Sequence, residues 1–374
     1  MKIRQVESFD LTIPHEVVCR PAWAPGREES ARAFTVVLVH TDTGLSGIGG
    51  GDGHWSSKVE RDIAPFLVGE DPLFVQRHAR VFRNAPGPWF VELALWDIVG
   101  KAANQPLFRL WGAARDKVPA YASMAELSTP EERAEQAKHY LAMGFRALKL
   151  RFHANSLPDD LEYADAVLDA VGDRMKLMVD ANQANMFVPC PSVGPHWDYS
   201  RAYRTAKELE DRRVLWLEEP QGRWDFRELA RLTQNTRIYI AGGERNQVED
   251  FREMALQGAY DILQPDVTKA GTLSGALKVK ALCELFNIHL VPHHGASGIG
   301  LSATIHLLCT YSGWTYAEFM YDPPYRTIET YQCLGGIITT PIRIDEEGCV
   351  APLPGPGLGI EIDRKVMEGY VEKH

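Results

Sequence analysis

Ionisable side chains recur along the second half of the chain at intervals close to the length of one strand plus one helix. They are Lys149, Asp180, Glu218, Glu244, Asp266, His293 and Glu318. Successive members are 31, 38, 26, 22, 27 and 25 residues apart, and each follows or ends a short apolar segment. A barrel of parallel strands gathers such residues at one mouth, where the carboxyl ends of the strands meet. We therefore predict a single active site that contains all of them.

Three of these residues are acids on consecutive predicted strands: Asp180, Glu218 and Glu244. Carboxylates in one confined site repel one another unless a cation offsets their charge. All-oxygen ligation suits Mg²⁺, with Mn²⁺ as an alternative, and the absence of His or Cys from the trio argues against zinc. The spacing therefore predicts a divalent-metal site.

Asp266 and His293 end the next two predicted strands. A carboxylate beside an imidazole orients the ring and raises its basicity, so this pair predicts a general acid/base. The adjacent His294 is expected to point to the opposite side of the strand, because side chains alternate along a strand. We rank it second to His293, as a substrate contact.

Lys149 and Arg151 are two residues apart and should face the barrel interior together. Arginine stays protonated and suits gripping a carboxylate, whereas lysine can act as an acid or base when its pKa is lowered. Glu318, on the last strand, could donate a hydrogen bond to a substrate carboxylate if an apolar site kept it protonated. The alternative for Glu318 is a salt bridge to Lys149.

Short apolar segments alternate with amphipathic ones from Val118 onward, which predicts repeated βα units and an α/β fold. The predicted strands are VPAYASM, RALKLRF, MKLMVDA, VLWLEE, RIYIAGGE, YDILQPD, IHLVPHH and WTYAEF. Residues 128–132 (STPEE) combine a hydroxyl N-cap, proline in the first turn and acidic residues, which predicts a helix start. Eight such units predict a modified (β/α)8 TIM-type barrel over residues 117–319.

Residues 1–116 have a different pattern, which predicts an N-terminal α+β capping domain. Alternating segments at 2–13, 33–40 and 45–50 predict strands, and apolar periodicity at 56–68, 72–84 and 89–103 predicts helices. The turn-rich residues 320–374 are expected to return to this domain. Residues 184–198 are rich in Pro, Gly and aromatics, and predict a long loop over the barrel mouth, either a lid or a surface excursion without a role.

Composition excludes several functional classes. The chain has 374 residues, 45% hydrophobic and 24% charged, without an apolar run long enough for a membrane span or a signal peptide, so we expect a cytoplasmic protein with no membrane partner. The net charge of −10 and the lack of a basic stripe argue against nucleic acid as a partner. Six dispersed cysteines predict reduced thiols rather than a disulfide scaffold.

Seven segments in order resemble the mandelate racemase subgroup of the enolase superfamily. They are ALWDIVGKAANQPLFRLWG, FRALKLR, VDANQA, WLEEP, AGGE, QPDVTKAGT and PHHGASGIG. The resemblance implies a capping domain whose loops, near residues 15–30 and 45–55, set specificity over a barrel that holds Mg²⁺ on Asp180, Glu218 and Glu244. It also implies an Asp266–His293 dyad, an electrophilic Glu318, and a homo-oligomer, either a dimer or an octamer. Glu218 rather than Glu219 is taken as the ligand, and Asn182 and Trp23 as substrate contacts.

The chemistry that the resemblance implies is removal of the α-proton of a carboxylate substrate, with metal stabilisation of the resulting enediolate. Racemases of the subgroup carry a second base at the last lysine of a Lys-x-Lys motif, where this chain has Arg151, a poor base. His153 could replace it only if the strand continued, and we expect it in a loop. One base suffices for dehydration, so we predict a sugar-acid dehydratase that gives a 2-keto-3-deoxy acid.

Three other functions stay open from sequence. A racemase or epimerase, or a cycloisomerase, could be built from the same residues. A metal-free Schiff-base aldolase could use Lys149. A non-catalytic binding protein is disfavoured, because stability does not require so many inward polar groups.

Overall fold

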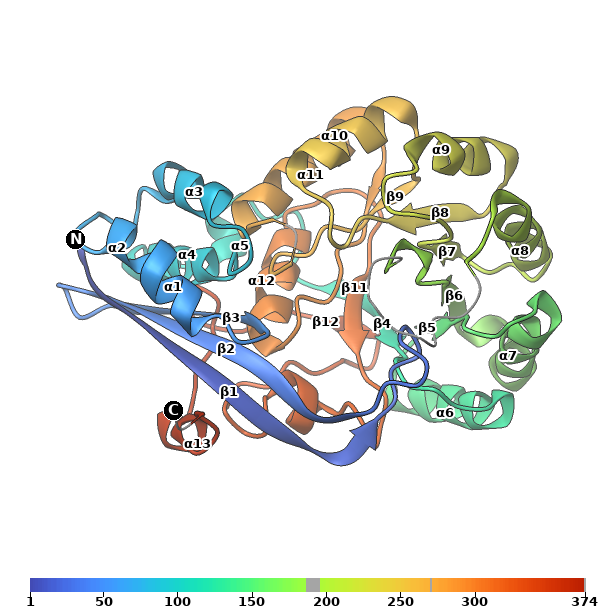
Figure 1. Ribbon diagram of the computed structural model, residues 1–374, viewed down its shortest axis with the longest axis horizontal. Coiled ribbons are helices and arrows are strands. Elements are labelled where there is room, and N and C mark those ends of the chain that lie inside the picture. Colours follow the sequence, from blue (N-terminus) through green and yellow to red (C-terminus); the bar gives the residue numbers. More distant parts are fainter. Residues whose placement is uncertain (186–195, 270, 373–374) are drawn as a thin grey trace.

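The computed structural model describes residues 1–185, 196–269 and 271–372. Near the N-terminus, β1 (Ile3–Cys19), β2 (Glu29–Thr41) and β3 (Ser46–Asp52) form an antiparallel sheet in that order. Five helices follow it along the chain and lie beside this sheet (Figure 1). They are α1 (Ser56–Asp62), α2 (Ala64–Leu67), α3 (Val75–Asn84), α4 (Val91–Ala102) and α5 (Leu107–Leu110). All three predicted strands and the three predicted helical segments are therefore present.

The glycine-rich sequence of β3 is explained by the helix that packs on it. A Cβ atom added to Gly47 would lie 2.0 Å from the carbonyl oxygen of Ala94, and one added to Gly49 would lie 2.2 Å from that of Phe90. Only glycine lets the backbone of α4 approach the strand this closely. The contact fixes α4 against the sheet whose far end borders the barrel mouth.

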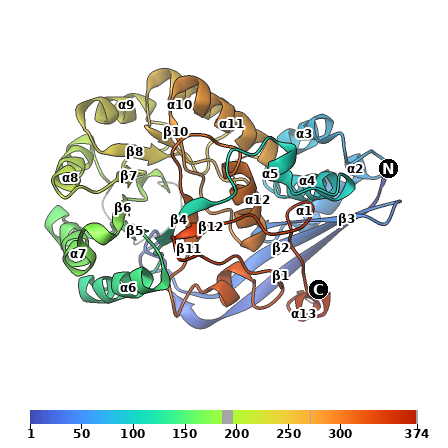
Figure 2. The same cartoon turned by 180° about the vertical axis from the view of Figure 1, so that it is seen from behind.

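Most of the remaining chain forms a curled parallel sheet surrounded by helices (Figures 1 and 2). Its strands are β4 (Val118–Ser123), β5 (Ala147–Arg151), β6 (Lys176–Asp180), β7 (Trp216–Glu218), β8 (Tyr239–Gly242), β9 (Ile262–Leu263), β10 (His289–Leu290) and β11 (Ala317–Met320). Its helices are α6 (Pro130–Met143), α7 (Leu157–Val171), α8 (Tyr199–Asp211), α9 (Phe226–Asn235), α10 (Val248–Gln257), α11 (Leu273–Phe286) and α12 (Gly298–Leu308). The predicted α/β fold, a modified barrel behind an N-terminal α+β unit, is confirmed.

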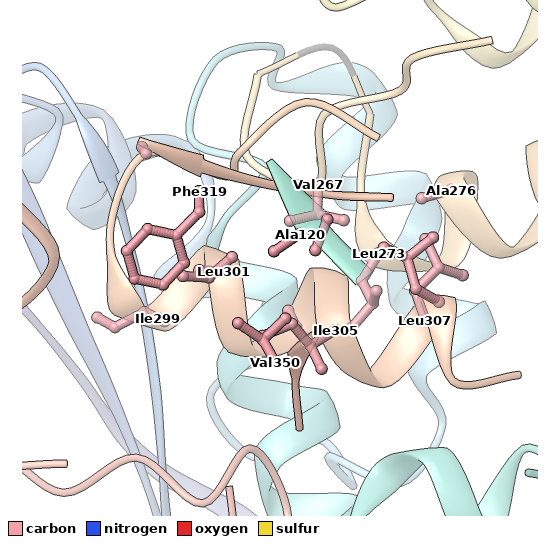
Figure 3. Close-up of a cluster of buried hydrophobic side chains, with 14 of the residues drawn as sticks. Ala120, Val267, Leu273, Ala276, Ile299, Leu301, Ile305, Leu307, Phe319 and Val350 are labelled. Atoms are coloured by element: carbon pink, nitrogen blue, oxygen red, sulfur yellow. The ribbon is translucent and has the colours of Figure 1, made fainter. Parts of the chain in front are cut away.

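Strand pairing runs from β10 through β9, β8, β7, β6, β5 and β4 to β11. In the described chain no ladder joins β10 to β11, but the Thr315 hydroxyl donates to the Leu290 carbonyl across this seam at 2.5 Å. All residues of α12, which connects the two strands, are buried. Figure 3 shows its Ile299, Leu301, Ile305 and Leu307 in a cluster with Ala120 of β4 and Phe319 of β11. This fully buried and mostly apolar helix is therefore packed on all sides.

The sequence signals for individual helices are mostly reproduced. Thr129 caps α6, its side chain accepts from the Glu132 N–H, and Pro130 is the first helical residue, as the 128–132 pattern predicts. Strands β9 and β10 are shorter than predicted, with two residues each. Asp266, His293 and His294 therefore lie in loops beyond the strand ends, where strand alternation no longer applies.

The C-terminal segment contacts both parts of the molecule. Its β12 (Cys349–Val350) pairs antiparallel with β4 of the barrel. Near its end, the Thr12 N–H of β1 donates to the Tyr370 carbonyl at 3.0 Å, just after α13 (Arg364–Glu368). These contacts agree with the predicted return toward the N-terminal sheet, while the domain boundary at residue 116 stays a prediction.

Three expectations concern the rest of the chain. Most of the predicted loop at 184–198 falls on residues 186–195, outside the described residues. The five described cysteines are free, and four of them are buried, whereas Cys190 lies outside the described part. Within the described ranges, no helix combines the length and apolarity that crossing a bilayer requires.

Candidate active site

A cavity of about 760 Å³ lies where the N-terminal sheet and its loops meet the barrel mouth. Trp23, Arg27 and Glu29 line it from the first predicted specificity loop, and Asp52 and Gly53 line it from the second. The barrel contributes Arg151, Asn182, Glu244, His293 and His294. The structure therefore brings the predicted cap loops and much of the predicted constellation to one space.

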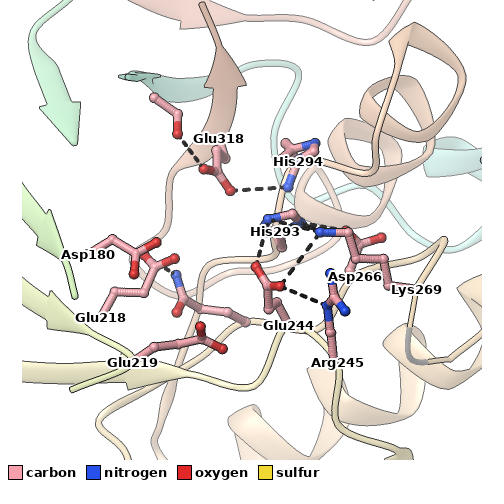
Figure 4. Close-up of polar contacts among 12 residues, drawn as sticks. Asp180, Glu218, Glu219, Glu244, Arg245, Asp266, Lys269, His293, His294 and Glu318 are labelled. Carbon is pink, nitrogen blue, oxygen red and sulfur yellow. Dashed lines mark hydrogen bonds and ion pairs between the residues drawn. The ribbon is translucent and has the colours of Figure 1, made fainter. Parts of the chain in front are cut away.

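Strand register sets the positions of the acids. Asp180 ends β6 and Glu218 ends β7, and the two are direct partners in the parallel ladder. Glu244 follows two residues after the end of β8. All three side chains are buried, and Figure 4 shows Asp180 and Glu218 next to each other, with Glu244 turned toward His293. Glu219, the residue after Glu218, has a φ of 44°, and its buried carboxylate has no hydrogen bond among the described residues.

Two cationic side chains from β5 contact the carboxylates of Asp180 and Glu218. The Lys149 Nζ lies 2.7 Å from Glu218 Oε1 and 3.7 Å from Asp180 Oδ2. The Arg151 guanidinium pairs with Asp180. As predicted, both side chains face the same interior space. Burial raises the pKa of Asp180 to about 7, and the neighbouring Glu218 charge adds to the rise.

The donor chemistry of the acids fits a hard divalent cation, because every predicted ligand is a carboxylate oxygen. Burial and the charge of Glu244 raise the pKa of Glu219 to about 8, which shows that negative charge is crowded here. In the described ranges, no three His, Cys, Asp or Glu side chains converge closely enough to ligate one ion as they stand. A shared ion on Asp180, Glu218 and Glu244 therefore stays a prediction, and Glu244 would exchange its contact with His293 for it.

His293 and Asp266 form the predicted pair. The His293 Nδ1 lies 2.5 Å from Asp266 Oδ2, and the His293 Nε2 lies 2.8 Å from Glu244 Oε2. The Asp266 carboxylate is fixed in turn by the N–H and hydroxyl of Thr268, each at 2.7 Å. Burial lowers the pKa of His293, but the acids Glu244, Glu318 and Asp266 together more than offset this and raise it to about 9. The ring is thus oriented on one side and carries its proton toward Glu244 on the other.

The expectation that His294 points away from His293 is wrong. Both rings line the cavity, and their centroids are 3.9 Å apart. The reason is that β10 ends at Leu290, so the two residues belong to an irregular loop. The His294 Nδ1 accepts from the Ala296 N–H at 2.9 Å. Burial and the nearby His293 lower the pKa of His294 well below its ordinary value.

Glu318 forms the salt bridge to Lys149 that the sequence left as the alternative. Glu318 Oε1 lies 2.9 Å from Lys149 Nζ and accepts from the Ser123 hydroxyl at 2.7 Å. Burial raises the pKa of Glu318, but the charges of Lys149, His293 and Arg151 together outweigh it, and the pKa falls to about 2. The fully buried Lys149 has a raised pKa, which argues against its acting as a free amine in a Schiff-base aldolase.

Of the remaining predicted residues, Asn182 and Trp23 line the described cavity wall and His153 does not. Asn182 lines the cavity, and its Oδ1 accepts from Arg151 at 3.3 Å. Trp23 lines it too, with its ring 5.3 Å from the Arg151 guanidinium carbon. His153 lies in the loop after β5, as expected, and packs against Tyr163 at a centroid distance of 5.3 Å. It is absent from the described cavity wall, which argues against a role as a second base.

The sequence reasoning missed several cavity residues. The Lys269 Nζ lies 3.4 Å from both ring nitrogens of His293. Lys269 stands inside the quoted QPDVTKAGT segment, three residues after Asp266, so its position beside the dyad was a usable signal. Arg32, Arg326 and Tyr331 come from distant segments without a strand-end pattern, and nothing in their spacing indicated them.

Comparison with known proteins agrees with this geometry. Residues 132–366 match the family model for the enolase C-terminal domain-like fold, and residues 11–112 match that for the N-terminal domain of mandelate racemase and muconate lactonizing enzyme. The chain belongs to the enolase superfamily, in its mandelate racemase subgroup. This superfamily member is 28% identical to an arabinonate dehydratase of Saccharolobus solfataricus over 83% of its own length and 82% of the relative. It is 31% identical to a 3,6-anhydro-α-L-galactonate cycloisomerase of Streptomyces coelicolor, over 73% of its own length and 68% of the relative.

Among solved structures, this enolase-superfamily chain resembles a racemase from Streptomyces coelicolor with bound magnesium. The TM-score is 0.84 at 26% identity, and the match covers 99% of this chain and 100% of the other. Dehydratases, cycloisomerases and racemases are thus all among the proteins it resembles, so the fold alone does not select the reaction.

Proposed function

We propose that the chain is a Mg²⁺-dependent dehydratase that removes water from a sugar acid to give a 2-keto-3-deoxy acid. The observation that carries the proposal is the Asp266–His293 pair, in which Asp266 orients a His293 ring that lines the cavity. Relatives named as dehydratases of arabinonate and galactonate support the substrate class. Mn²⁺ could replace Mg²⁺, since both accept oxygen ligands.

We assign each part of the reaction to residues of this site. Asp180, Glu218 and Glu244 would hold the ion, which supplies electrophilic stabilisation to the substrate carboxylate when bound. His293 Nε2 takes the α-proton, while Asp266 holds the ring in place through Nδ1. Among the groups around His293, Glu244 raises the pKa of the imidazole most. If Glu244 binds another cation instead, His293 favours its neutral, basic form. Lys269, beside both ring nitrogens, is placed to protonate the leaving β-hydroxyl.

Elimination is favoured over two-base racemisation by the state of Arg151. Its pKa is raised, because Asp180 and Glu318 outweigh the effect of burial. A guanidinium in this position cannot take a proton from the second face of a substrate. Racemase, epimerase and cycloisomerase activities remain the alternatives within the superfamily.

The proposal is tested by incubating the Mg²⁺-loaded protein with a panel of sugar acids in D₂O. We expect semicarbazide-reactive keto acid to form, and EDTA to abolish it. Deuterium entering recovered substrate with inversion at the α-carbon, without keto acid, would instead identify a racemase or epimerase. Turnover that survives complete chelation would rule out the metal-dependent mechanism.

The metal assignment predicts that Glu244→Gln weakens Mg²⁺ binding. Loss of one anionic oxygen ligand from a three-carboxylate site should lower the affinity by about 10-fold or more, an order-of-magnitude expectation for oxygen-ligated hard cations. Isothermal titration with MgCl₂ measures this directly. Glu249→Gln, in the first turn of α10, is the matched control. Equal affinity in Glu244→Gln and wild type would remove Glu244 from the site.

A further inference from the structure

A row of alternating cations and aromatic rings leads away from the reaction centre along the cavity wall. The ring of Trp23 contacts two guanidinium groups, 5.3 Å from the carbon of Arg151 and 5.2 Å from that of Arg326. The ring of Tyr331 contacts Arg326 and Arg32, at 5.5 Å and 4.1 Å. Arg326 and Arg151 thus share the indole ring of Trp23 as a neighbour.

Arg32 is committed to the protein. Its Nη2 donates to Asp52 Oδ1 at 2.7 Å, and its Nη1 donates to the Tyr331 carbonyl at 3.0 Å. It therefore joins β2 to the C-terminal segment, and has little capacity left for a ligand.

Arg326 has donor capacity to spare. Its Nε donates to Glu126 Oε1 at 2.7 Å, which fixes the orientation of the guanidinium. Its Nη2 is buried without a hydrogen-bond partner among the described residues, and forms only a longer ion pair with Glu29 at 3.6 Å. The residue is 5% exposed and lines the cavity. An unsatisfied donor on a buried cation is costly, unless a ligand supplies the acceptor.

A planar guanidinium that is oriented by one carboxylate and stacked between two rings is suited to receiving another carboxylate. The described cavity wall also carries more cations than anions, six against three. Arg326 and the acid/base residues Glu244 and His293 are different parts of the same cavity wall. A ligand that reaches both positions needs an anionic group at each end.

We infer that the substrate is a dicarboxylic sugar acid, whose carboxylate remote from the reacting carbon binds Arg326. This rests on the proposed function for the reacting end of the molecule. Arg326 then acts in binding and specificity and takes no part in proton transfer.

The test compares hexaric acids with the matching hexonic acids, which differ only in the distal group. Titrations use the Mg²⁺-loaded His293→Asn protein, so that ligand is not consumed. We expect Arg326→Gln in this background to weaken hexarate binding by about 10- to 100-fold, as for loss of a charge-assisted hydrogen bond. Hexonate binding should change less than about 3-fold, because a terminal hydroxyl forms no ion pair with the guanidinium. Equal losses for both ligands, or for neither, would overturn the inference.

Two further variants keep the test decisive. Arg326→Gln leaves Glu126 buried without its partner, so the double variant with Glu126→Gln repeats the comparison in a neutral background. Arg364→Gln removes an arginine that stacks on Phe9 at the outer surface, and should leave both affinities unchanged. If wild-type protein exchanges no α-proton with any acid, the proposed reaction fails, while an Arg326-dependent preference for hexarate would still support the subsite.

Discussion

Replacing His293 with asparagine is expected to lower the rate of α-proton exchange by at least about 10³-fold, the scale of a lost general base. The imidazole is the group that Asp266 orients at 2.5 Å and that faces the cavity. Asparagine is close in size and polarity, so the surrounding packing should survive. The rate is measured by NMR as loss of the substrate α-proton signal in D₂O, with keto-acid release followed in parallel.

His153→Asn provides a matched control for this variant. His153 is another loop histidine at the barrel end, but it is half-buried, packs against Tyr163 and is absent from the described cavity wall. We expect wild-type exchange in His153→Asn, and a folded protein that still binds Mg²⁺ in both variants. Substantial exchange by a folded His293→Asn protein would move the base elsewhere, with Lys269 as the next group to replace.

The sequence predicted the site where strand ends determine position. Asp180 and Glu218 are ladder partners, and Lys149 and Arg151 face inward together, because the geometry of parallel strands leaves little choice. His294 was placed wrongly because the same strand geometry was assumed where it no longer applies. Strand alternation was extended past Leu290, where the ladder has ended and loop contacts orient the side chains.

Ionisation states and the distal cavity wall could not be predicted in this way. The charge of Glu318 depends on Lys149, which reaches it from β5 at 2.9 Å, and this distance is not present in the sequence. Arg32, Arg326 and Tyr331 meet only because the C-terminal segment folds back against β2, almost 300 residues away. Such contacts follow from tertiary packing and leave no periodic pattern.

Replacing Lys149 with methionine is expected to lower the free energy of unfolding by about 3–5 kcal/mol, the cost of removing one partner from a buried ion pair. Lys149 is fully buried, and its Nζ contacts Glu218 at 2.7 Å and Glu318 at 2.9 Å. Methionine preserves the length of the apolar stem but leaves both carboxylates without their shared cation. Urea denaturation in metal-free buffer measures the loss.

Mg²⁺ should restore part of that stability. A divalent cation held by Asp180, Glu218 and Glu244 neutralises some of the carboxylates that Lys149 contacts. A ligand that binds only the native state also stabilises that state. We therefore expect the deficit of Lys149→Met to shrink as MgCl₂ is added, and to persist in NaCl of equal ionic strength. Lys117→Met, which removes a surface pair with Asp345 and Glu347, should show neither the deficit nor the rescue. A deficit insensitive to Mg²⁺ would mean that the lysine and the ion do not share the same carboxylates, and the metal would then have to be placed outside the Asp180–Glu218 pair.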